Sequence, residues 1–317
     1  MSNKISTDLV ILGGGPAGIS AGIYAARGMI KTIILETTTL GGQLNWTQTI
    51  ENYPGHSSTT GADLIERFEE QLNSLNVNIV TFQEILNVDL LSETKVITTS
   101  EKTYLAKAVI ISTGAGPKKL GIPGEMEFTG MGVSYCAVCD GAFFKEKEIC
   151  VIGGGNSAIE EGVYLTKFAS KVNIVHRRDT LKASKLYQQK AISNPKINFI
   201  WNTVAVEIQG TPKGVNNIVL KNVNTKETTN LKTDGVFPYI GTKANTDLFK
   251  HQIKLDNNGY IITNAEMTTS IPGVFAAGDV RKTPLRQIVV SASDGAIAAT
   301  SAIRYIDELY EENESLV

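Results

Sequence analysis

An apolar run that ends in three glycines, Asp8-Leu-Val-Ile-Leu-Gly-Gly-Gly-Pro-Ala-Gly18, decides the fold of this chain. A helical pattern follows it to about Arg27, and a second apolar strand over 32–35 ends at Glu36. Strand, glycine turn, helix and strand in this order bind dinucleotides, because the glycines let a pyrophosphate approach the N-terminus of the helix. The sequence therefore predicts a dinucleotide-binding unit at the start of the chain.

The same unit occurs again in the middle of the chain. A strand over 149–152 leads into Gly153-Gly-Gly-Asn-Ser-Ala158, a helical pattern runs to about Phe168, and the next strand, over 172–175, ends at His176. One glycine motif alone is weak evidence, whereas two in full structural context are strong. We expect an α/β fold with two Rossmann-like dinucleotide-binding domains.

The residue that closes the second strand indicates what each unit binds. An acidic residue there hydrogen-bonds a ribose 2′-hydroxyl, whereas cations accommodate a 2′-phosphate. The first unit has Glu36, and the second has His176-Arg-Arg178 with Lys182 one helical turn further on. We therefore expect FAD in the first unit and NADPH in the second. The alternative is that the two arginines form a solvated turn.

A third cofactor signal lies near the C-terminus. The apolar run Val274-Phe-Ala-Ala-Gly-Asp279 ends in a glycine and an acid, and Arg286-Gln287 and a long helical pattern follow. Another apolar strand, over 109–114, ends in Ser-Thr-Gly. Because signals for FAD lie at both ends of the chain, we expect a discontinuous FAD domain over 1–117 and 247–317. An NADPH domain over 118–246 is inserted into it.

The segment Gly132-Val-Ser-Tyr-Cys-Ala-Val-Cys-Asp-Gly141 carries the chemistry. Cys-x-x-Cys spacing permits a reducible disulfide. Zinc is the competing ligand, but a structural zinc site needs four ligands, and the three histidines are scattered along the chain. The only other cysteine, Cys150, lies in an apolar strand and is expected to be a small buried side chain. No metal site is predicted.

Asp140 directly follows the second cysteine of this pair. Opening a disulfide releases a thiolate, and release of the dithiol needs a proton donor. An ordinary aspartate is only about 0.1% protonated at pH 7. Asp140 is therefore expected to act as an acid only where burial favours its protonated form. The alternative is an ordinary turn aspartate.

Composition excludes several classes of function. The 317 residues carry a net charge of −2, which provides no basic stripe for nucleic acid and no polybasic patch for a membrane surface. No apolar run is long enough to cross a bilayer, and the short N-terminal apolar stretch is expected to be a strand and not a signal peptide. With only three cysteines, we expect a cytoplasmic protein.

In these motifs the chain resembles the low-molecular-weight FAD/NADPH thioredoxin reductases of the pyridine nucleotide-disulfide oxidoreductases, and most closely those of Gram-positive bacteria. The resemblance covers nearly the whole chain. The further motifs that carry it are Gly41-Gly-Gln43, Glu51-Asn-Tyr-Pro-Gly55, Cys136-Ala-Val-Cys-Asp-Gly-Ala-Phe-Phe144 and Glu160-Glu161.

The resemblance implies roles for individual residues. The redox disulfide is Cys136 with Cys139, and the acid is Asp140. The residues expected to contact FAD are Gly13, Gly15, Pro16, Ala17, Glu36, Gly42, Gln43, Asn52, Thr113, Gly114, Gly278, Asp279, Arg286, Gln287 and Ile288. Those expected to contact NADPH are Gly155, Asn156, Ser157, Ala158, His176, Arg177, Arg178 and Lys182.

The resemblance also implies an activity, a thioredoxin-disulfide reductase that moves electrons from NADPH through FAD and the disulfide to thioredoxin. The family is homodimeric, and its NADPH domain swings relative to the FAD domain. Phe143 and Phe144 are candidates for docking thioredoxin, or else core residues. The alternatives are a ferredoxin-fed flavin thioredoxin reductase, a flavin-dependent dithiol oxidase, or a non-catalytic redox sensor.

The chain departs from the family pattern at four positions. They are Lys182 in place of an arginine, Asn156 in place of an aspartate, Ser293 in place of a glycine, and Pro238 within an apolar run. The first two weaken the expected preference for NADPH. The proline predicts a strand end or a sheet edge, because it removes a hydrogen-bond donor from the ladder.

Overall fold

The computed structural model describes residues 4–47 and 50–314 and divides the chain into two units. Unit 1 consists of Met1–Gly116 and Lys243–Val317, and unit 2 is Pro117–Thr242. Two short strands carry the chain between the units and pair with each other, β7 (Ala115–Pro117) and β15 (Thr242–Ala244). Unit 2 therefore ends at Thr242, whereas the sequence led us to expect the inserted domain to end at 246.

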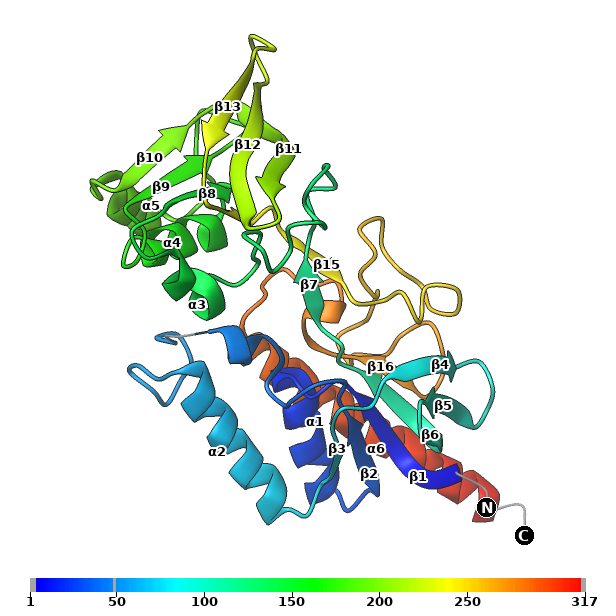
Figure 1. The fold of residues 1–317 in the computed structure, drawn as a ribbon. Helices are drawn as coiled ribbons and strands as arrows, with labels where there is room; N and C mark the ends of the chain where they lie inside the picture. The colour runs from blue at the N-terminus through cyan, green and yellow to red at the C-terminus, as the bar shows by residue number, and fades with distance from the viewer. Residues whose placement is uncertain (1–3, 48–49, 315–317) are drawn as a thin grey trace. The chain divides into compact units, whose positions relative to one another are not determined.

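Unit 1 is built on a seven-stranded sheet (Figure 1). Four parallel strands come first, in the order β3 (Asn78–Val80), β2 (Thr32–Leu35), β1 (Lys4–Leu12) and β6 (Thr103–Ile111). On the side away from β1, strand β6 pairs with two different strands. Antiparallel β5 (Lys95–Thr99) pairs with its beginning and parallel β16 (Val274–Ala276) with its end, while β4 (Ile85–Asp89) pairs with β5.

The register of these strands brings three distant segments together. Leu12 and Ala276 both lie opposite Ile111, so β1, β6 and β16 end at the same level of the sheet. The residues that follow them, 13–18, 112–114 and 277–279, therefore meet at one edge of the sheet. This is the edge at which parallel α/β sheets bind their ligands.

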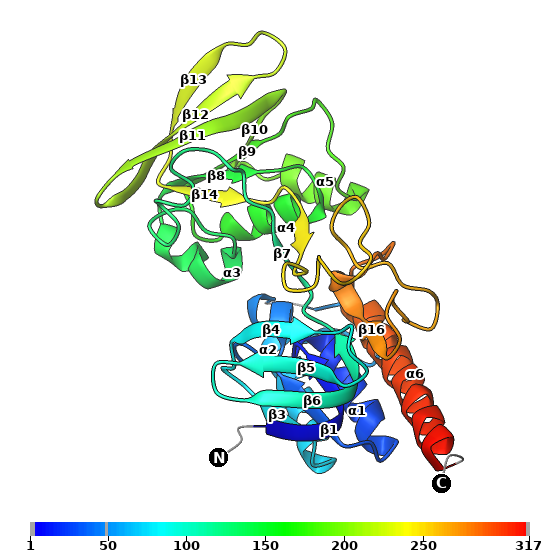
Figure 2. The same cartoon turned by 90° about the vertical axis from the view of Figure 1, so that its right-hand side faces the viewer.

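The alternation of side chains along β1 separates two cores. Leu9 and Ile11 are buried against three helices, α1 (Pro16–Arg27), α2 (Gly61–Ser74) and α6 (Ile288–Glu314). Val10 and Leu12 face the other way and pack against β4, β5 and residues 249–280. Figure 2 shows α6 running along unit 1. Helices α1 and α6 approach closely at Gly295, where a Cβ would overlap the carbonyl oxygen of Ala17.

Unit 2 contains a second parallel sheet, a second set of helices and a small antiparallel sheet. The parallel sheet has the order β10 (Ile197–Ile200), β9 (Lys171–Val175), β8 (Glu148–Ile152) and β14 (Gly235–Pro238). Its helices are α3 (Ala137–Asp140), α4 (Asn156–Leu165) and α5 (Lys185–Ile192). The antiparallel strands are β11 (Thr203–Thr211), β12 (Gly214–Asn222) and β13 (Thr228–Lys232).

Two expectations for the fold are met. Each unit has the strand, glycine turn, helix and strand of the α/β pattern. Pro238 ends β14, which is an edge strand of its sheet, as its missing N–H predicted. In the part of the chain that the structure describes, no helix is long and apolar enough to span a membrane.

Candidate active site

The first glycine turn of unit 1 is shaped for a phosphate group. At Gly13, with φ +104°, a Cβ would lie 2.5 Å from the carbonyl oxygen of Ser112, and at Gly18 it would overlap the Gly13 carbonyl oxygen. These two glycines therefore permit strand and helix to pack closely. At Gly15 the nearest atom to a Cβ would be 3.9 Å away, so the backbone is open at the start of α1. The open turn fits the pyrophosphate of FAD.

The carboxylate of Glu36 lies at the end of β2, beside this turn. Its Oε2 accepts the Gly14 N–H at 2.7 Å, and its Oε1 accepts the Thr38 N–H at 2.9 Å and two threonine hydroxyls at 3.2 Å. The side chain is buried and held by these donors. Since each carboxylate oxygen accepts about two hydrogen bonds, Oε2 retains one acceptor position for a ribose hydroxyl.

A half-buried acid and an arginine nitrogen without a hydrogen-bond acceptor lie after the end of β16. The Gln43 amide donates to Asp279 Oδ2 at 3.3 Å and to the Ala115 carbonyl at 3.2 Å. Burial raises the pKa of Asp279, while Arg286 opposes this rise. Arg286 stacks 4.3 Å from the Tyr260 ring centroid, and its Nε is buried without a hydrogen-bond acceptor. A buried donor of this kind fits an acceptor of a bound cofactor.

The other expected FAD contacts also lie in unit 1. Asn52 donates to Gln287 at 2.8 Å, 235 positions away, and Thr113 donates to the Asn245 carbonyl at 2.9 Å. The remaining predicted residues are found in the glycine turn and α1 (Pro16, Ala17), in the 3₁₀ helix Gly42–Trp46 (Gly42), after β6 (Gly114), after β16 (Gly278) and at the start of α6 (Ile288).

Sequence reasoning missed Asp294. This residue is 4% exposed, and its Oδ2 accepts the Gly278 N–H at 3.1 Å and forms an ion pair with the Arg281 Nε at 3.1 Å. Burial raises its pKa, an effect that Arg281 opposes. Asp294 thus holds the Gly278 turn from α6. The signal in the sequence was an aspartate within the apolar pattern of a helix. The neighbouring Ser293, which departs from the family pattern, is exposed.

The glycine turn of unit 2 repeats the geometry of the first. At Gly153, with φ +148°, a Cβ would overlap the carbonyl oxygen of Tyr239, whereas no atom lies within 4 Å of a Cβ at Gly155. Ala158 is fully buried behind the turn, and Ser157 is exposed in the first turn of α4. The side-chain Oδ1 of Asn156 accepts the Ser184 N–H at 2.8 Å, so this departure from the family pattern anchors the neighbouring loop.

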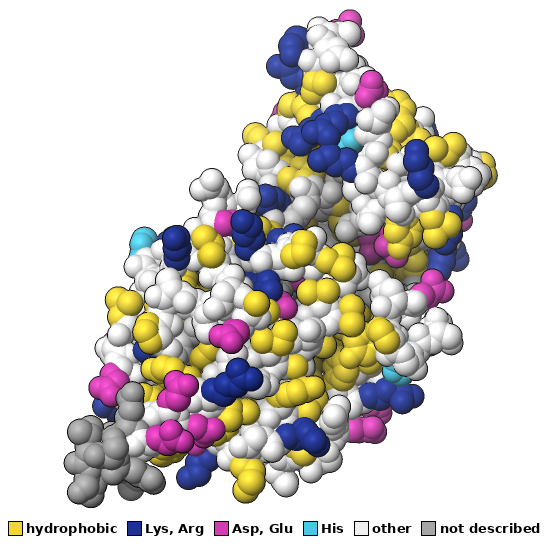
Figure 3. Space-filling view, turned by 180° about the vertical axis from the view of Figure 1, so that it is seen from behind, with side chains coloured by type: hydrophobic (Ala, Val, Ile, Leu, Met, Phe, Trp, Pro, Cys, Tyr) yellow, Lys and Arg dark blue, Asp and Glu magenta, His cyan; other side chains and the backbone are white. Residues whose placement is uncertain are grey.

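Three cations surround a buried histidine at the end of β9. The His176 ring packs against Gly154, and its Nε2 is buried without a partner. Burial lowers the pKa of His176, and the nearby Arg178, Arg177 and Lys182 lower it further. The three cations themselves are exposed. Figure 3 shows Lys and Arg side chains gathered beside a histidine on one face of this unit. The arrangement fits a phosphate group.

The predicted disulfide is present between Cys136 and Cys139. Cys136 is half-buried and Cys139 is exposed, one turn apart around α3. The Ala137 N–H donates to the Tyr239 hydroxyl at 3.0 Å, and the Cys136 N–H donates to the Ser134 hydroxyl at 3.1 Å. The N-terminal end of the disulfide segment is therefore fixed within unit 2.

Tyr239 is the second residue that sequence reasoning missed. Its side chain holds α3, and its main chain lies against the Gly153 turn, so one residue connects the disulfide with the nucleotide turn. Burial raises the pKa of Tyr239, with smaller contributions from Glu161 and Asp140. Burial, together with Glu160, raises the pKa of Glu161 to about 7. An acidic group with a pKa near neutrality therefore lies close to α3.

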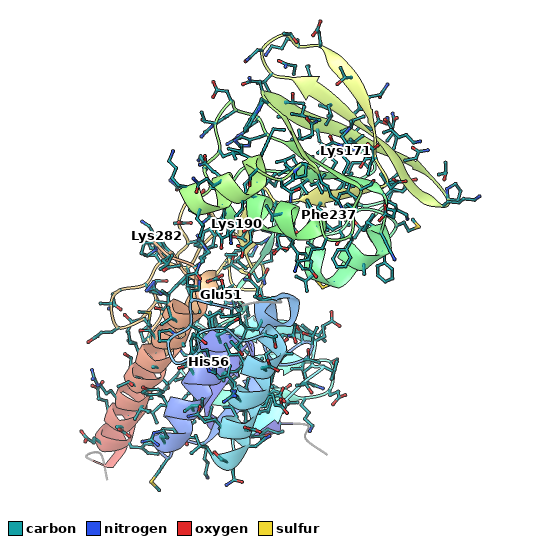
Figure 4. All side chains as sticks on the ribbon, turned by 90° about the vertical axis from the view of Figure 1, so that its left-hand side faces the viewer. Glu51, His56, Lys171, Lys190, Phe237 and Lys282 are labelled. Atoms are coloured by element: carbon teal, nitrogen blue, oxygen red, sulfur yellow. A yellow bond between two sulfur atoms is a disulfide. The ribbon has the colours of Figure 1, made fainter. Side chains whose placement is uncertain are left out.

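The two phenylalanines after the disulfide have different environments. Phe143 is 75% exposed, so it is available to a partner. Phe144 is buried and packs edge-on against Phe237, at 5.2 Å between ring centroids, so a docking role for Phe144 is wrong. Phe237 is labelled in Figure 4. Cys150 is a free, fully buried cysteine, as predicted, and burial raises its pKa. Among the described residues, no three His, Cys, Asp or Glu side chains gather to hold a metal.

Comparison with known proteins gives one consistent result. The family model for pyridine nucleotide-disulphide oxidoreductases matches residues 7–295. The chain is 49% identical over 312 residues to a thioredoxin reductase of Peptoclostridium acidaminophilum, covering 96% of this chain and 98% of that protein. It is 46% identical over 316 residues to that of Bacillus subtilis, covering 100% of both. The crystal structure of Lactococcus lactis thioredoxin reductase superimposes with a TM-score of 0.92, at 45% identity, over 95% of this chain and 99% of that one.

Removing the half-buried charge of Asp279 should stabilise the flavin-free protein at neutral pH. Because the pKa of Asp279 is raised above 3.8, its ionisation opposes folding as the pH rises through that value. The variant Asp279→Asn should therefore gain in Tm between pH 4 and pH 7, by about 2–4 °C for ~1 kcal/mol. Its affinity for FAD should fall. Thermal unfolding and flavin titration measure the two effects.

The matched control is Asp247→Asn in the same unit. Lys243 lowers the pKa of the exposed Asp247, so its small stabilising contribution is present at pH 7 and lost in acid. This variant should lose slightly in Tm at pH 7. A gain in Tm for both variants, or for neither, would contradict the conclusion that the ionised Asp279 side chain destabilises the flavin-free protein.

Proposed function

Because the chain belongs to the pyridine nucleotide-disulphide oxidoreductase family, we propose that it is a thioredoxin reductase. It carries electrons from NADPH through FAD and the Cys136–Cys139 disulfide to oxidised thioredoxin. The observation that carries this proposal is the placement of an accessible disulfide in the unit that also contains the cation-lined nucleotide turn. Similarity to thioredoxin reductases over 96–100% of the chain supports it.

The residues of unit 1 would hold FAD, which when bound supplies a two-electron carrier. The open backbone at Gly15 receives the pyrophosphate, and the free acceptor position of Glu36 receives a ribose hydroxyl. Asp279, Gln43 and Arg286 offer an acceptor and donors to the remaining polar groups of the cofactor. Asp294 acts through the Gly278 turn and is a positioning residue.

The residues of unit 2 would select NADPH. The backbone at Gly155 is open to a pyrophosphate, and Arg177, Arg178 and Lys182 provide positive charge for the 2′-phosphate. The His176 ring, kept neutral by burial, retains a nitrogen without a partner. These cations argue against a ferredoxin-fed reductase or a dithiol oxidase, which have no need of a 2′-phosphate site.

The disulfide unit performs thiol–disulfide exchange. In the reduced state, one cysteine thiolate attacks a sulfur of the thioredoxin disulfide, and one thioredoxin sulfur leaves as a thiolate. The second cysteine of this chain then attacks the mixed disulfide, which releases dithiol thioredoxin and re-forms Cys136–Cys139. Asp140, which follows Cys139 in the chain, would exchange the proton that these thiolates require.

The roles of single residues, the oligomeric state and the cellular location are predicted as follows. The roles of the individual cofactor-binding residues rest on the family motifs and on the fit described above. A homodimer is expected from the same resemblance. A cytoplasmic location is expected from the low number of cysteines.

The first experiment is anaerobic mixing of the FAD-loaded protein with NADPH or NADH while the visible flavin absorbance is followed. NADPH should bleach the flavin fast, and NADH at the same concentration should not. Arg177→Ala and Arg178→Ala should each raise the KM for NADPH about tenfold, the loss of one charge-assisted hydrogen bond, and leave the KM for NADH nearly unchanged. Lys190→Ala, on the exposed face of α5 (Figure 4), is the control and should change neither.

No bleaching by either nucleotide would contradict the proposal and favour the ferredoxin-fed or oxidase alternative. If NADPH bleaches the flavin but the protein does not reduce thioredoxin, only the choice of thioredoxin as substrate is contradicted. Sustained turnover would exclude the non-catalytic sensor.

Asp140→Asn should separate the two halves of the reaction. Flavin reduction by NADPH should stay fast because it needs no proton at the disulfide, whereas thioredoxin reduction should slow by at least tenfold, since positioned acids contribute about 10²–10⁴. Stopped-flow absorbance and steady-state turnover measure the two steps. Unchanged turnover would remove Asp140 from the mechanism.

Phe143→Ala tests the docking surface. Because Phe143 is exposed, its removal should leave Tm within about 1 °C and raise the apparent KM for thioredoxin several-fold, as expected for an aromatic anchor at an interface. Turnover with a small aromatic disulfide, which needs no docking surface, is the control and should not change. An unchanged KM for thioredoxin would exclude this role.

A further inference from the structure

A buried carboxylate with neutral partners lies close to the disulfide. Glu125 is 1% exposed. Its Oε1 accepts the Tyr135 hydroxyl and the Leu120 N–H, and its Oε2 accepts the Gly121 N–H, all at 2.7 Å. None of the ion pairs among the described residues includes it.

A buried carboxylate is costly unless its acceptor positions are filled, and removal of one partner leaves the others unsatisfied. Three short hydrogen bonds from fixed donors meet that requirement here. Burial and Glu125 raise the pKa of Tyr135, so the phenol keeps its proton and remains a donor. The interaction is therefore a charge-assisted hydrogen bond of defined direction.

The partners of Glu125 lie at two functionally distinct places. Leu120 and Gly121 follow β7, where the chain enters unit 2, and Tyr135 is the residue directly before Cys136. The loop that joins them is itself fixed, because the Thr129 hydroxyl donates to the Glu125 carbonyl at 2.8 Å. Glu125 thus closes residues 120–135 into one hydrogen-bonded loop.

We propose that Glu125 and Tyr135 form a positioning pair for the redox disulfide. The Tyr135 hydroxyl ties the backbone beside Cys136 to the buried carboxylate and holds the Cys136 sulfur within bonding reach of Cys139. This inference rests on the proposed function only in taking Cys136–Cys139 as the redox centre. Neither residue touches the reacting sulfurs in the hydrogen bonds described, so each acts through the backbone of Cys136.

The consequence of this tie is thermodynamic. A segment held with its two thiols close together closes a disulfide more readily than a loose one, because less conformational entropy is lost on closure. Removing the tie should therefore favour the dithiol and make the reduction potential of the couple less negative. The effect should not depend on which electron acceptor the protein uses.

The test is the reduction potential of Cys136–Cys139 in the FAD-loaded protein, measured by thiol alkylation in dithiothreitol redox buffers. Tyr135→Phe, which removes one oxygen atom, should lower the equilibrium constant for disulfide formation about fivefold, which is about 20 mV for two electrons. Glu125→Gln should shift it in the same direction. The double variant should shift it no more than Glu125→Gln alone, since the two act as one unit.

The control is Tyr164→Phe, on α4 of the same unit, which should leave the potential unchanged. A lower Tm with an unchanged potential in Tyr135→Phe would overturn the proposal and make the pair merely structural. Additive shifts in the double variant would also overturn it. Where Glu125→Gln fails to fold, Tyr135→Phe alone decides.

Turnover of thioredoxin by the parent protein is measured in parallel. A parent that does not reduce thioredoxin, with a shifted potential in Tyr135→Phe, would overturn the proposed function and support the positioning pair. A parent that reduces thioredoxin, with an unshifted potential in Tyr135→Phe, would support the proposed function and overturn the positioning pair.

Discussion

The close approach of the Gly13 turn to the Ser112 carbonyl is the contact on which unit 1 depends. It is possible only without a side chain at that position, and it brings the end of β1 against the end of β6. The end of β16 reaches the same level from the far end of the sequence. The segments 13–18, 112–114 and 277–279 meet at this shared sheet edge, so parts of the chain that are distant in sequence lie together in unit 1.

The same constraint recurs in unit 2 with a different partner. There Gly153 packs against the carbonyl oxygen of Tyr239, whose side chain holds the disulfide helix. The nucleotide turn and the disulfide are therefore joined through one residue. Glu125 ties Tyr135, the residue directly before Cys136, to the place where the chain enters the unit. The helix that carries the disulfide has only four residues, and these polar contacts hold it in place.

Each unit contains a buried polar atom without a partner near its expected nucleotide site. The Arg286 Nε in unit 1 belongs to a cation close to Asp279, and the His176 Nε2 in unit 2 belongs to a ring that packs against Gly154. An unsatisfied buried group costs stability, so its position in a nucleotide-binding geometry points to a ligand that satisfies it. Burial also raises the pKa values of Asp279 and Asp294. Their charges therefore cost the flavin-free protein stability, in the same way as the two unpartnered nitrogens.

The sequence by itself determined the α/β class, the two glycine turns, the contrast between Glu36 and the arginines, and the cysteine pair. These signals are local: alternation and helical periodicity report burial, and a turn or a Cys-x-x-Cys spacing acts within a few residues. Only the tertiary structure revealed the contacts of Asp294, Tyr239 and Glu125, and the burial of Phe144 beside an exposed Phe143. Tyr239 lies 102 positions from the residue it holds, and Gln43 lies 236 positions from Asp279. Contacts over such distances leave no periodic trace in the sequence, because the packing of whole strands and helices brings the partners together.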